Sequence, residues 1–158
     1  MKTIDFSLFL WYDIGINLGG IGMKKVYTAE IKKSDLLKAQ QGEIDAVIVY
    51  HKLADRIAKK DSEIHKKLMS IGSDEGRHAN MLRKLTGEVR NPKSTLANIV
   101  VCLTYLIGKK RTLLLMAKAE HKALETYKPF VEQYPELEPM RLDEEKHGNI
   151  LDNIANEL

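Results

Sequence analysis

Two ten-residue stretches of this 158-residue chain each place a glutamate and a histidine three positions apart on an apolar helical stripe. They read SDEGRHANML at 73–82 and LDEEKHGNIL at 142–151. Residues three apart on a helix share a face, so each pair points its carboxylate and its imidazole in one direction. The flanking leucines and isoleucines point the same way, toward the expected core. A chain that buries such groups twice needs something inside the protein to hold them.

The spacing of apolar residues from residue 34 onward predicts four long helices. Ser34 is expected to cap the first, Asp61-Ser62 the second, and Gly87 to end the second. An apolar run with no charged residue lies between the second and third helices. The expected helical ranges are about 34–60, 62–87, 113–130 and 140–158, and the apolar run covers 95–108.

The two halves of the chain repeat one another, and the repeat adds a further glutamate to the pattern. Glu43 aligns with Glu120, and Tyr50 aligns with Tyr127. Because helices joined by short turns run antiparallel, each of these glutamates falls near the level of the Glu-x-x-His pair that follows it. Glu125 competes with Glu120 for this place, but it breaks both the repeat and the apolar stripe. The aligned segments are GEIDAVIVYHKL (42–53) with AEHKALETYKPF (119–130), and DEGRHANML (74–82) with DEEKHGNIL (143–151).

Four glutamates and two histidines would thus meet in one core, and together they have the chemistry of a metal site. A carboxylate buried without a partner costs several kcal/mol, and four would consume the stability of a domain of this size. The inner stripes hold no Lys or Arg, whereas two divalent cations would balance four negative charges. Oxygen ligands with one imidazole per ion suit iron or manganese, and zinc is chemically compatible. The predicted ligands are Glu43, Glu75, His78, Glu120, Glu144 and His147.

Other polar residues near the stripes leave alternatives open. Tyr50 and Tyr127 are either hydrogen-bond donors to the ligands or packing residues whose hydroxyls are satisfied elsewhere. Asp74 and Asp143 each precede a ligand glutamate, and a carboxylate in such a place commonly hydrogen-bonds the ligand histidine of a neighbouring helix. The remaining histidines lie off the inner stripe and are expected to be solvated: His51, His65 and His121.

The six-residue pattern, in this order, resembles the ferritin-like superfamily of di-iron carboxylate proteins, and most of all its rubrerythrin-like branch. The resemblance covers about residues 35–158. It implies an all-α fold, an antiparallel four-helix bundle with a long crossover between helices two and three, of which the run 95–108 would form part. It also implies two iron ions bridged by Glu75 and Glu144, the residues expected to be catalytic, with the other two glutamates terminal and one histidine on each iron.

The activity that this resemblance implies is reduction of hydrogen peroxide or dioxygen at a diferrous centre, in oxidative-stress defence or iron handling. Rubrerythrins typically carry a second carboxylate one turn after the third-helix glutamate, where this chain has Ala123 and Leu124. They also carry a rubredoxin domain with two cysteine pairs, which the single cysteine here, Cys102, cannot supply. An external electron donor is therefore expected, and iron storage or iron oxidation gains weight.

Two alternatives remain at this point. The order of Glu, Ala, Tyr and Glu-x-x-His is also similar to demethoxyubiquinone hydroxylase, a membrane-associated di-iron monooxygenase. The run 95–108 beside Lys109-Lys110-Arg111 fits a membrane surface, although a crossover buried against the bundle is the more economical interpretation. The other alternative is a non-catalytic bundle that binds iron.

The composition fits one globular domain preceded by an extension. A hydrophobic fraction of 44% and a charged fraction of 30% are ordinary for a globular protein, and a net charge of +3, spread along the chain, does not predict nucleic-acid binding. Residues 1–22 show no helical period and predict a loosely attached extension ahead of a ferritin-like domain over 23–158. Asp5 and Asp13 interrupt the apolar part of this extension, which disfavours a secretion signal. A cytoplasmic location and a homodimer are expected.

Overall fold

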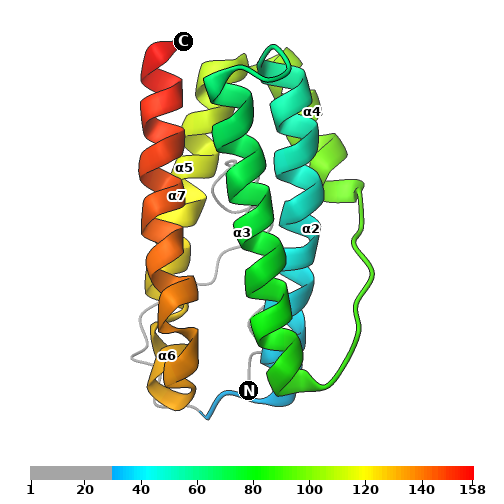
Figure 1. Ribbon diagram of the computed structural model, residues 1–158, viewed down its shortest axis with the longest axis vertical. Coiled ribbons are helices and arrows are strands. Elements are labelled where there is room, and N and C mark those ends of the chain that lie inside the picture. The colour runs from blue at the N-terminus through cyan, green and yellow to red at the C-terminus, as the bar shows by residue number, and fades with distance from the viewer. Residues whose placement is uncertain (1–29) are drawn as a thin grey trace, which may run out of the picture.

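The computed structural model describes residues 30–158, which form helices joined by short connections and contain no strand (Figure 1). The predicted extension 1–22, and its boundary with a domain that begins at residue 23, lie outside the described residues. The elements in chain order are α2 (Lys33–Ile57), α3 (Glu63–Thr86), α4 (Thr95–Leu106), α5 (Lys109–Thr126), α6 (Lys128–Gln133), a 3₁₀ turn (Pro135–Leu137) and α7 (Glu138–Glu157).

The helices α2, α3, α5 and α7 form an antiparallel four-helix bundle with a long crossover, as predicted (Figure 1). The closest packing lies within two hairpins, α2 with α3 and α5 with α7. Because α3 and α5 run in the same direction, the chain must return along the bundle between them. The segment 87–94 and α4 make this return, and α4 packs against α2 and α5.

Local signals explain where most helices begin and end. The Ser62 hydroxyl accepts a hydrogen bond from the His65 amide at 3.2 Å, and Gly87 closes α3 with φ at 71°, both as predicted. The expected cap at Ser34 is wrong by two residues, because Lys32 is the N-cap of α2 and its amide donates a hydrogen bond to the Asp35 carboxylate.

The third long helix is shorter than predicted. Its expected range reached residue 130, whereas α5 ends at Thr126 and the short α6 follows from Lys128. Pro129 explains this break, because its nitrogen carries no hydrogen to bond the carbonyl one turn back. Tyr127 lies at the junction of the two helices, with its side chain buried.

Two apolar clusters fill the bundle, one toward each end. Burial of one Leu or Ile side chain contributes about 1.5–3 kcal/mol, so the clusters supply the stability that a polar layer between them would consume. The cluster nearer the α2–α3 turn includes Val49, Leu53, Ile57, Leu68, Ile71, Leu113, Leu151 and Ile154. The cluster nearer the α5–α7 turn includes Leu36, Ala39, Leu82, Tyr127, Phe130, Leu137 and Met140.

Side chains of α2 hold the crossover in place. The Gln40 amide donates to the Glu88 carbonyl at 2.9 Å, and the Asp45 carboxylate accepts a bond from the Lys93 amide at 2.6 Å. These bonds satisfy backbone groups that would otherwise lie unpaired against the bundle. The predicted crossover is therefore confirmed. None of the described helices is long and apolar enough to cross a membrane.

Candidate metal centre

The polar layer between the two apolar clusters contains all six residues that the sequence predicted as ligands. Each long helix passes from one cluster to the other and contributes one glutamate on the way. The helices of the Glu-x-x-His pairs add one histidine each. Five of the six side chains are buried, and Glu120 is half-buried. They are Glu43 on α2, Glu75 and His78 on α3, Glu120 on α5, and Glu144 and His147 on α7.

The six residues form two overlapping sets that could each hold a metal ion. Within each set, one potential ligand atom per residue lies within 4.8 Å of all the others. Glu75 and Glu144 belong to both sets, so each offers a carboxylate that can bridge two ions. The two imidazole rings lie 5.7 Å apart between centroids. The sets are Glu43, Glu75, His78 and Glu144, and Glu75, Glu120, Glu144 and His147.

Several buried atoms of this layer are arranged so that they could bind a cation. His78 Nδ1 lies 3.3 Å from a Glu75 oxygen and 3.4 Å from a Glu144 oxygen, and His147 Nδ1 lies 3.1 Å from Glu75. Both Nδ1 atoms and Oε1 of Glu75 and Glu144 have no hydrogen-bond partner among the described residues. Buried polar atoms left unpaired cost free energy, and native interiors contain few of them. Carboxylate oxygens and imidazole nitrogens are suitable donors for iron or manganese.

The crowding of carboxylates shifts their protonation. Burial, together with the charge of Glu75, raises the pKa of Glu43 to about 7, and burial also raises the pKa of Glu144. Burial opposes a charged imidazole at His78, but contacts with the surrounding glutamates outweigh it and raise the pKa of His78. Without a cation, the layer therefore retains protons at the atoms where a metal ion would bind.

Two aspartates fix the orientation of the two histidines. Oδ2 of Asp143 on α7 lies 3.3 Å from Nε2 of His78 on α3, and Oδ2 of Asp74 on α3 lies 3.3 Å from Nε2 of His147 on α7. The predicted contact between these aspartates and the histidine of a neighbouring helix is confirmed. With Nε2 engaged, Nδ1 of each ring faces the carboxylates and is the nitrogen available to a metal.

Two basic residues that sequence reasoning missed lie over these aspartates. The Arg77 guanidinium donates to Asp74 and, at 3.3 Å, to Asp143. The Lys146 ammonium lies 3.9 Å from Asp74 and 3.7 Å from Asp143. Although partial burial opposes it, the bond from Arg77 helps to lower the pKa of Asp74. The signal for both was present, because each repeat places a basic residue directly before its histidine.

The two tyrosines of the repeat donate hydrogen bonds to Glu43 and Glu120, the two glutamates that the ligand sets do not share. The Tyr50 hydroxyl donates to Glu120, and the Tyr127 hydroxyl donates to Glu43. The sequence left open whether these tyrosines bond the predicted ligands or only pack in the core, and the bonds to Glu120 and Glu43 confirm the first alternative. Each tyrosine bonds the glutamate of the opposite half of the repeat. Burial raises the pKa of both tyrosines, so the hydroxyls keep the protons that these bonds need.

A rubrerythrin family model matches residues 35–157. The match spans most of the chain and all six predicted ligands. The chain belongs to the rubrerythrin family. Searches of curated proteins and of solved structures give no match. Membership confirms the resemblance seen in the sequence, and it favours that resemblance over the similarity to demethoxyubiquinone hydroxylase.

Ala123 occupies the position one helical turn after Glu120 in this rubrerythrin-family chain. Ala123 is half-buried and packs against the apolar cluster that contains Tyr127 and Phe130. The position one turn after Glu120 therefore contributes packing instead of a further carboxylate. Glu125, the competitor for Glu120, is exposed and pairs with Lys128.

The expectation that the other histidines are solvated is wrong for His65. It is buried, with 8% of its surface exposed, and it bonds Asp55 at 3.2 Å. His51 and His121 are half-buried. His121 lies over Gly148 and bonds Asp152 at 3.0 Å, where a side chain larger than glycine on α7 would clash with its ring.

Proposed function

We propose that this rubrerythrin-family protein binds two iron ions and uses them to reduce hydrogen peroxide or dioxygen. The observation that carries the proposal is the pair of ligand sets that share Glu75 and Glu144. Four carboxylates balance the charge of two divalent ions, and the mixed oxygen and nitrogen donors suit iron, with manganese as a compatible substitute. Glu75 and Glu144 would bridge the ions and act as catalytic ligands, while Glu43 and Glu120 would bind one ion each.

Two bound ferrous ions would supply the two electrons that, with two protons, convert hydrogen peroxide to two molecules of water. The protein would supply the orientation of the ligands and a route for protons. Nε2 of His78 contacts Asp143, whose own side chain is 20% exposed, and the permanently charged Arg77 bonds this carboxylate at 3.3 Å. This series of contacts connects the buried centre with solvent, and we propose that it helps deliver protons.

We also propose that electrons come from an external donor. The single cysteine, Cys102, is exposed on α4 and cannot form the four-thiolate site of a rubredoxin centre. Reduction of the oxidised metal pair would then depend on a separate redox protein or a small reductant.

A second candidate function is oxidation or storage of iron, and the packing of Ala123 supports it. In rubrerythrins the carboxylate expected near this position moves with the redox state of the metals. A centre without it would cycle less readily as a peroxidase. In that function iron itself would be the substrate.

Anaerobic titration of the purified protein with Fe(II) tests both candidates. Two irons per chain, oxidised faster by hydrogen peroxide than by air, would support peroxide reduction. Faster oxidation by air, with further iron taken up, would support iron oxidation or storage. The Glu125→Gln variant is the matched control for Glu120→Gln, because it removes an exposed carboxylate of the same helix that lies outside both ligand sets. Binding without oxidation would leave a non-catalytic iron-binding bundle, and no binding would contradict the proposal.

A further inference from the structure

Within residues 30–158, the crossover helix α4 packs one face against the bundle and leaves its opposite face exposed. Ala97, Val100 and Thr104 are buried against the bundle. On the outward face, Tyr105 is 69% exposed and Leu106 is 73% exposed. None of the twelve residues of α4 is charged. Large apolar side chains gathered on an exposed helix mark an interaction surface more often than they occur by chance.

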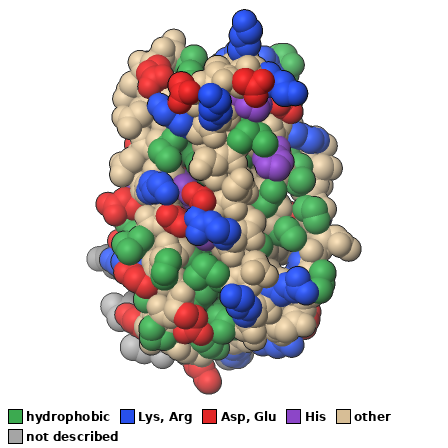
Figure 2. All heavy atoms as spheres, viewed as in Figure 1, with side chains coloured by type: hydrophobic (Ala, Val, Ile, Leu, Met, Phe, Trp, Pro, Cys, Tyr) green, Lys and Arg blue, Asp and Glu red, His purple; other side chains and the backbone are tan. Residues whose placement is uncertain are grey.

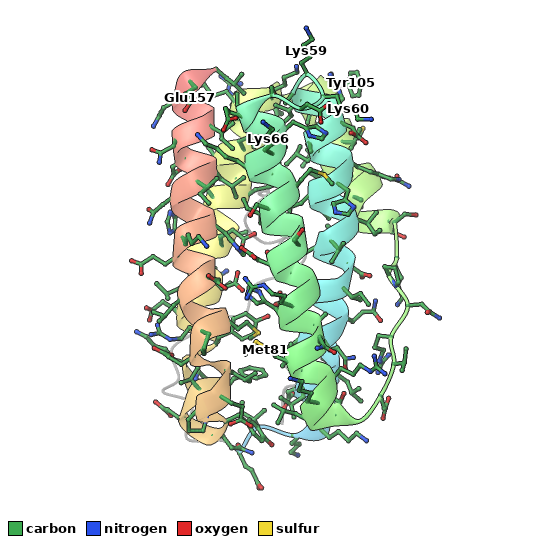
Figure 3. The ribbon with its side chains drawn as sticks, viewed as in Figure 1. Lys59, Lys60, Lys66, Met81, Tyr105 and Glu157 are labelled. Atoms are coloured by element: carbon green, nitrogen blue, oxygen red, sulfur yellow. The ribbon has the colours of Figure 1, made fainter. Side chains whose placement is uncertain are left out.

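Basic residues surround this apolar face. Residues 93–119 contain five Lys or Arg and no Asp or Glu. Lys110 and Arg111 are exposed directly after α4. Lys59 and Lys60 lie in the α2–α3 turn, and both are exposed at the same end of the bundle as Tyr105 (Figure 3).

The Arg56 guanidinium belongs to the same surface, since it stacks 3.8 Å above the Tyr105 ring. The acidic residues of this end lie mostly toward α3 and α7, where they pair with basic side chains, as Glu157 does with Lys67 (Figure 3). Asp55 bonds His65, and Glu63 bonds Lys66, while Asp61 lies in the turn next to Lys60. The face of the bundle with α3 and α7 differs, because acidic and basic side chains alternate over it (Figure 2).

We propose that the outward face of α4, with its rim of basic residues, docks on the surface of an anionic lipid bilayer. Leu106 and Tyr105 would enter the boundary between headgroups and acyl chains, where tyrosine is a common anchor. Lys110, Arg111 and Lys59 would contact anionic headgroups, each basic residue adding affinity. In this proposal α4 lies along the bilayer surface and does not cross it, because twelve helical residues span only about 18 Å.

Two other occupants fit this face less well. A second copy of the chain, related by a two-fold axis, would bring two basic rims together, and like charges oppose such an interface. An acidic protein would match the charge, but protein interfaces carry about one hydrogen bond per 100–200 Å², and the outward side of α4 offers few polar groups. One of them, Asn98, already accepts a bond from Lys52 at 2.6 Å. A bilayer provides negative charge and an apolar interior together.

Vesicle flotation of the full chain tests the proposal. The protein should float with vesicles of phosphatidylcholine containing about 30 mol% phosphatidylglycerol, and binding should weaken as salt screens the headgroups. It should not float with pure phosphatidylcholine. The double variant Lys110→Gln, Arg111→Gln should bind about 30-fold more weakly, because each basic residue contributes about fivefold. Leu106→Gln should also weaken binding.

Matched variants separate this surface from the rest of the protein. Arg83→Gln with Lys84→Gln removes two exposed basic residues at the other end of α3, and Val89→Gln removes an apolar side chain that is 70% exposed. Both should float like the wild type. Absence of flotation with anionic vesicles, or equal flotation of the α4-face variants, would overturn the proposal. Binding to soluble polyglutamate without vesicle binding would overturn it in favour of an acidic protein partner. Dissociation of a dimer by Leu106→Gln, without vesicle binding, would overturn it in favour of a second copy.

Discussion

Asp143 on α7 contacts His78 on α3 at 3.3 Å, and Asp74 on α3 returns the same contact to His147 on α7. These reciprocal contacts join the two hairpins at the level of the candidate metal centre. Elsewhere α3 and α7 pack only sparsely against each other, compared with the packing inside each hairpin. The orientation of both histidines of the candidate centre therefore depends on a side chain from the opposite half of the repeat.

Removal of one of these aspartates should weaken metal binding. We expect Asp143→Ala to lower affinity for Mn(II) or Fe(II) by about 10–100-fold, because the His78 ring would lose the partner that holds Nδ1 toward the carboxylates. Anaerobic competition titration measures this change. Asp152→Ala is the control, since Asp152 makes a similar contact with a histidine outside the ligand sets, His121. Equal affinities for both variants would contradict the positioning role of Asp143.

The shared carboxylates and the unshared ones should differ in metal stoichiometry. Glu75→Ala or Glu144→Ala should abolish the paired site, because each residue belongs to both ligand sets. Glu43→Ala should lose one ion and retain the other, because the set with Glu120 stays complete. Metal analysis after dialysis against a fixed free metal concentration gives the counts. If Glu75→Ala still bound two ions with an unchanged spectrum, the assignment of Glu75 as a bridge would be wrong.

Much of this centre could be predicted from the sequence because the two halves of the chain repeat the same pattern of glutamates and histidines. The repeat pairs Glu43 with Glu120 and aligns the two Glu-x-x-His motifs, so a one-dimensional pattern fixes the level of each group in the bundle. The contacts between halves could not be predicted this way. Nothing in the repeat says that Tyr50 donates to Glu120 instead of Glu43, because that choice depends on how the hairpins face each other.

Features set by tertiary packing were also beyond the sequence pattern. The periodicity extended the third helix through residue 130, although Pro129 is a local signal for the break between α5 and α6. His65 looked solvated because it lies off the inner stripe, yet the α2–α3 hairpin buries it against Asp55. For α4, the sequence left two alternatives, a crossover buried against the bundle and a helix on a membrane surface, and the structure confirms the crossover. The helix is a crossover, and no described element covers its outward face.

Metal affinity should fall as the pH drops below 7. Burial and the charge of Glu75 raise the pKa of Glu43 to about 7, so this carboxyl becomes protonated in the metal-free protein below that pH. A metal ion must then displace the proton, which lowers affinity by about tenfold per pH unit for each proton displaced. The raised pKa of His78 adds a second proton to be released.

Titration with Mn(II) over about pH 6 to 8 measures this slope without oxidation of the metal. Glu43→Gln should bind more weakly and show a shallower dependence on pH, because its amide carries no titrating proton. A metal affinity that does not change with pH would contradict the prediction that the metal-free centre holds protons which the metal displaces. If affinity depended on pH equally in Glu43→Gln and in the wild type, the protons released on metal binding would come from groups other than Glu43.

Metal loading should stabilise the bundle chiefly at the contact between its hairpins. Without metal, Nδ1 of His78 and of His147 and an oxygen each of Glu75 and Glu144 lack hydrogen-bond partners among the described residues. A free metal concentration 100-fold above Kd would add about 2.7 kcal/mol to the free energy of unfolding, or about 5–10 °C in Tm for a domain of this size. Thermal unfolding followed by circular dichroism, with and without a chelator, gives the shift.

Hydrogen exchange locates this stabilisation. Amides of α3 and α7 around residues 75–78 and 144–147 should gain the most protection on metal binding, because these helices otherwise pack sparsely against each other. Glu75→Ala should show neither the Tm shift nor the added protection. The Tm could instead be the same with metal and with chelator in a protein that demonstrably binds metal. That result would mean that the two hairpins dock fully without metal. It would also mean that the protons of the polar layer already satisfy its buried polar atoms.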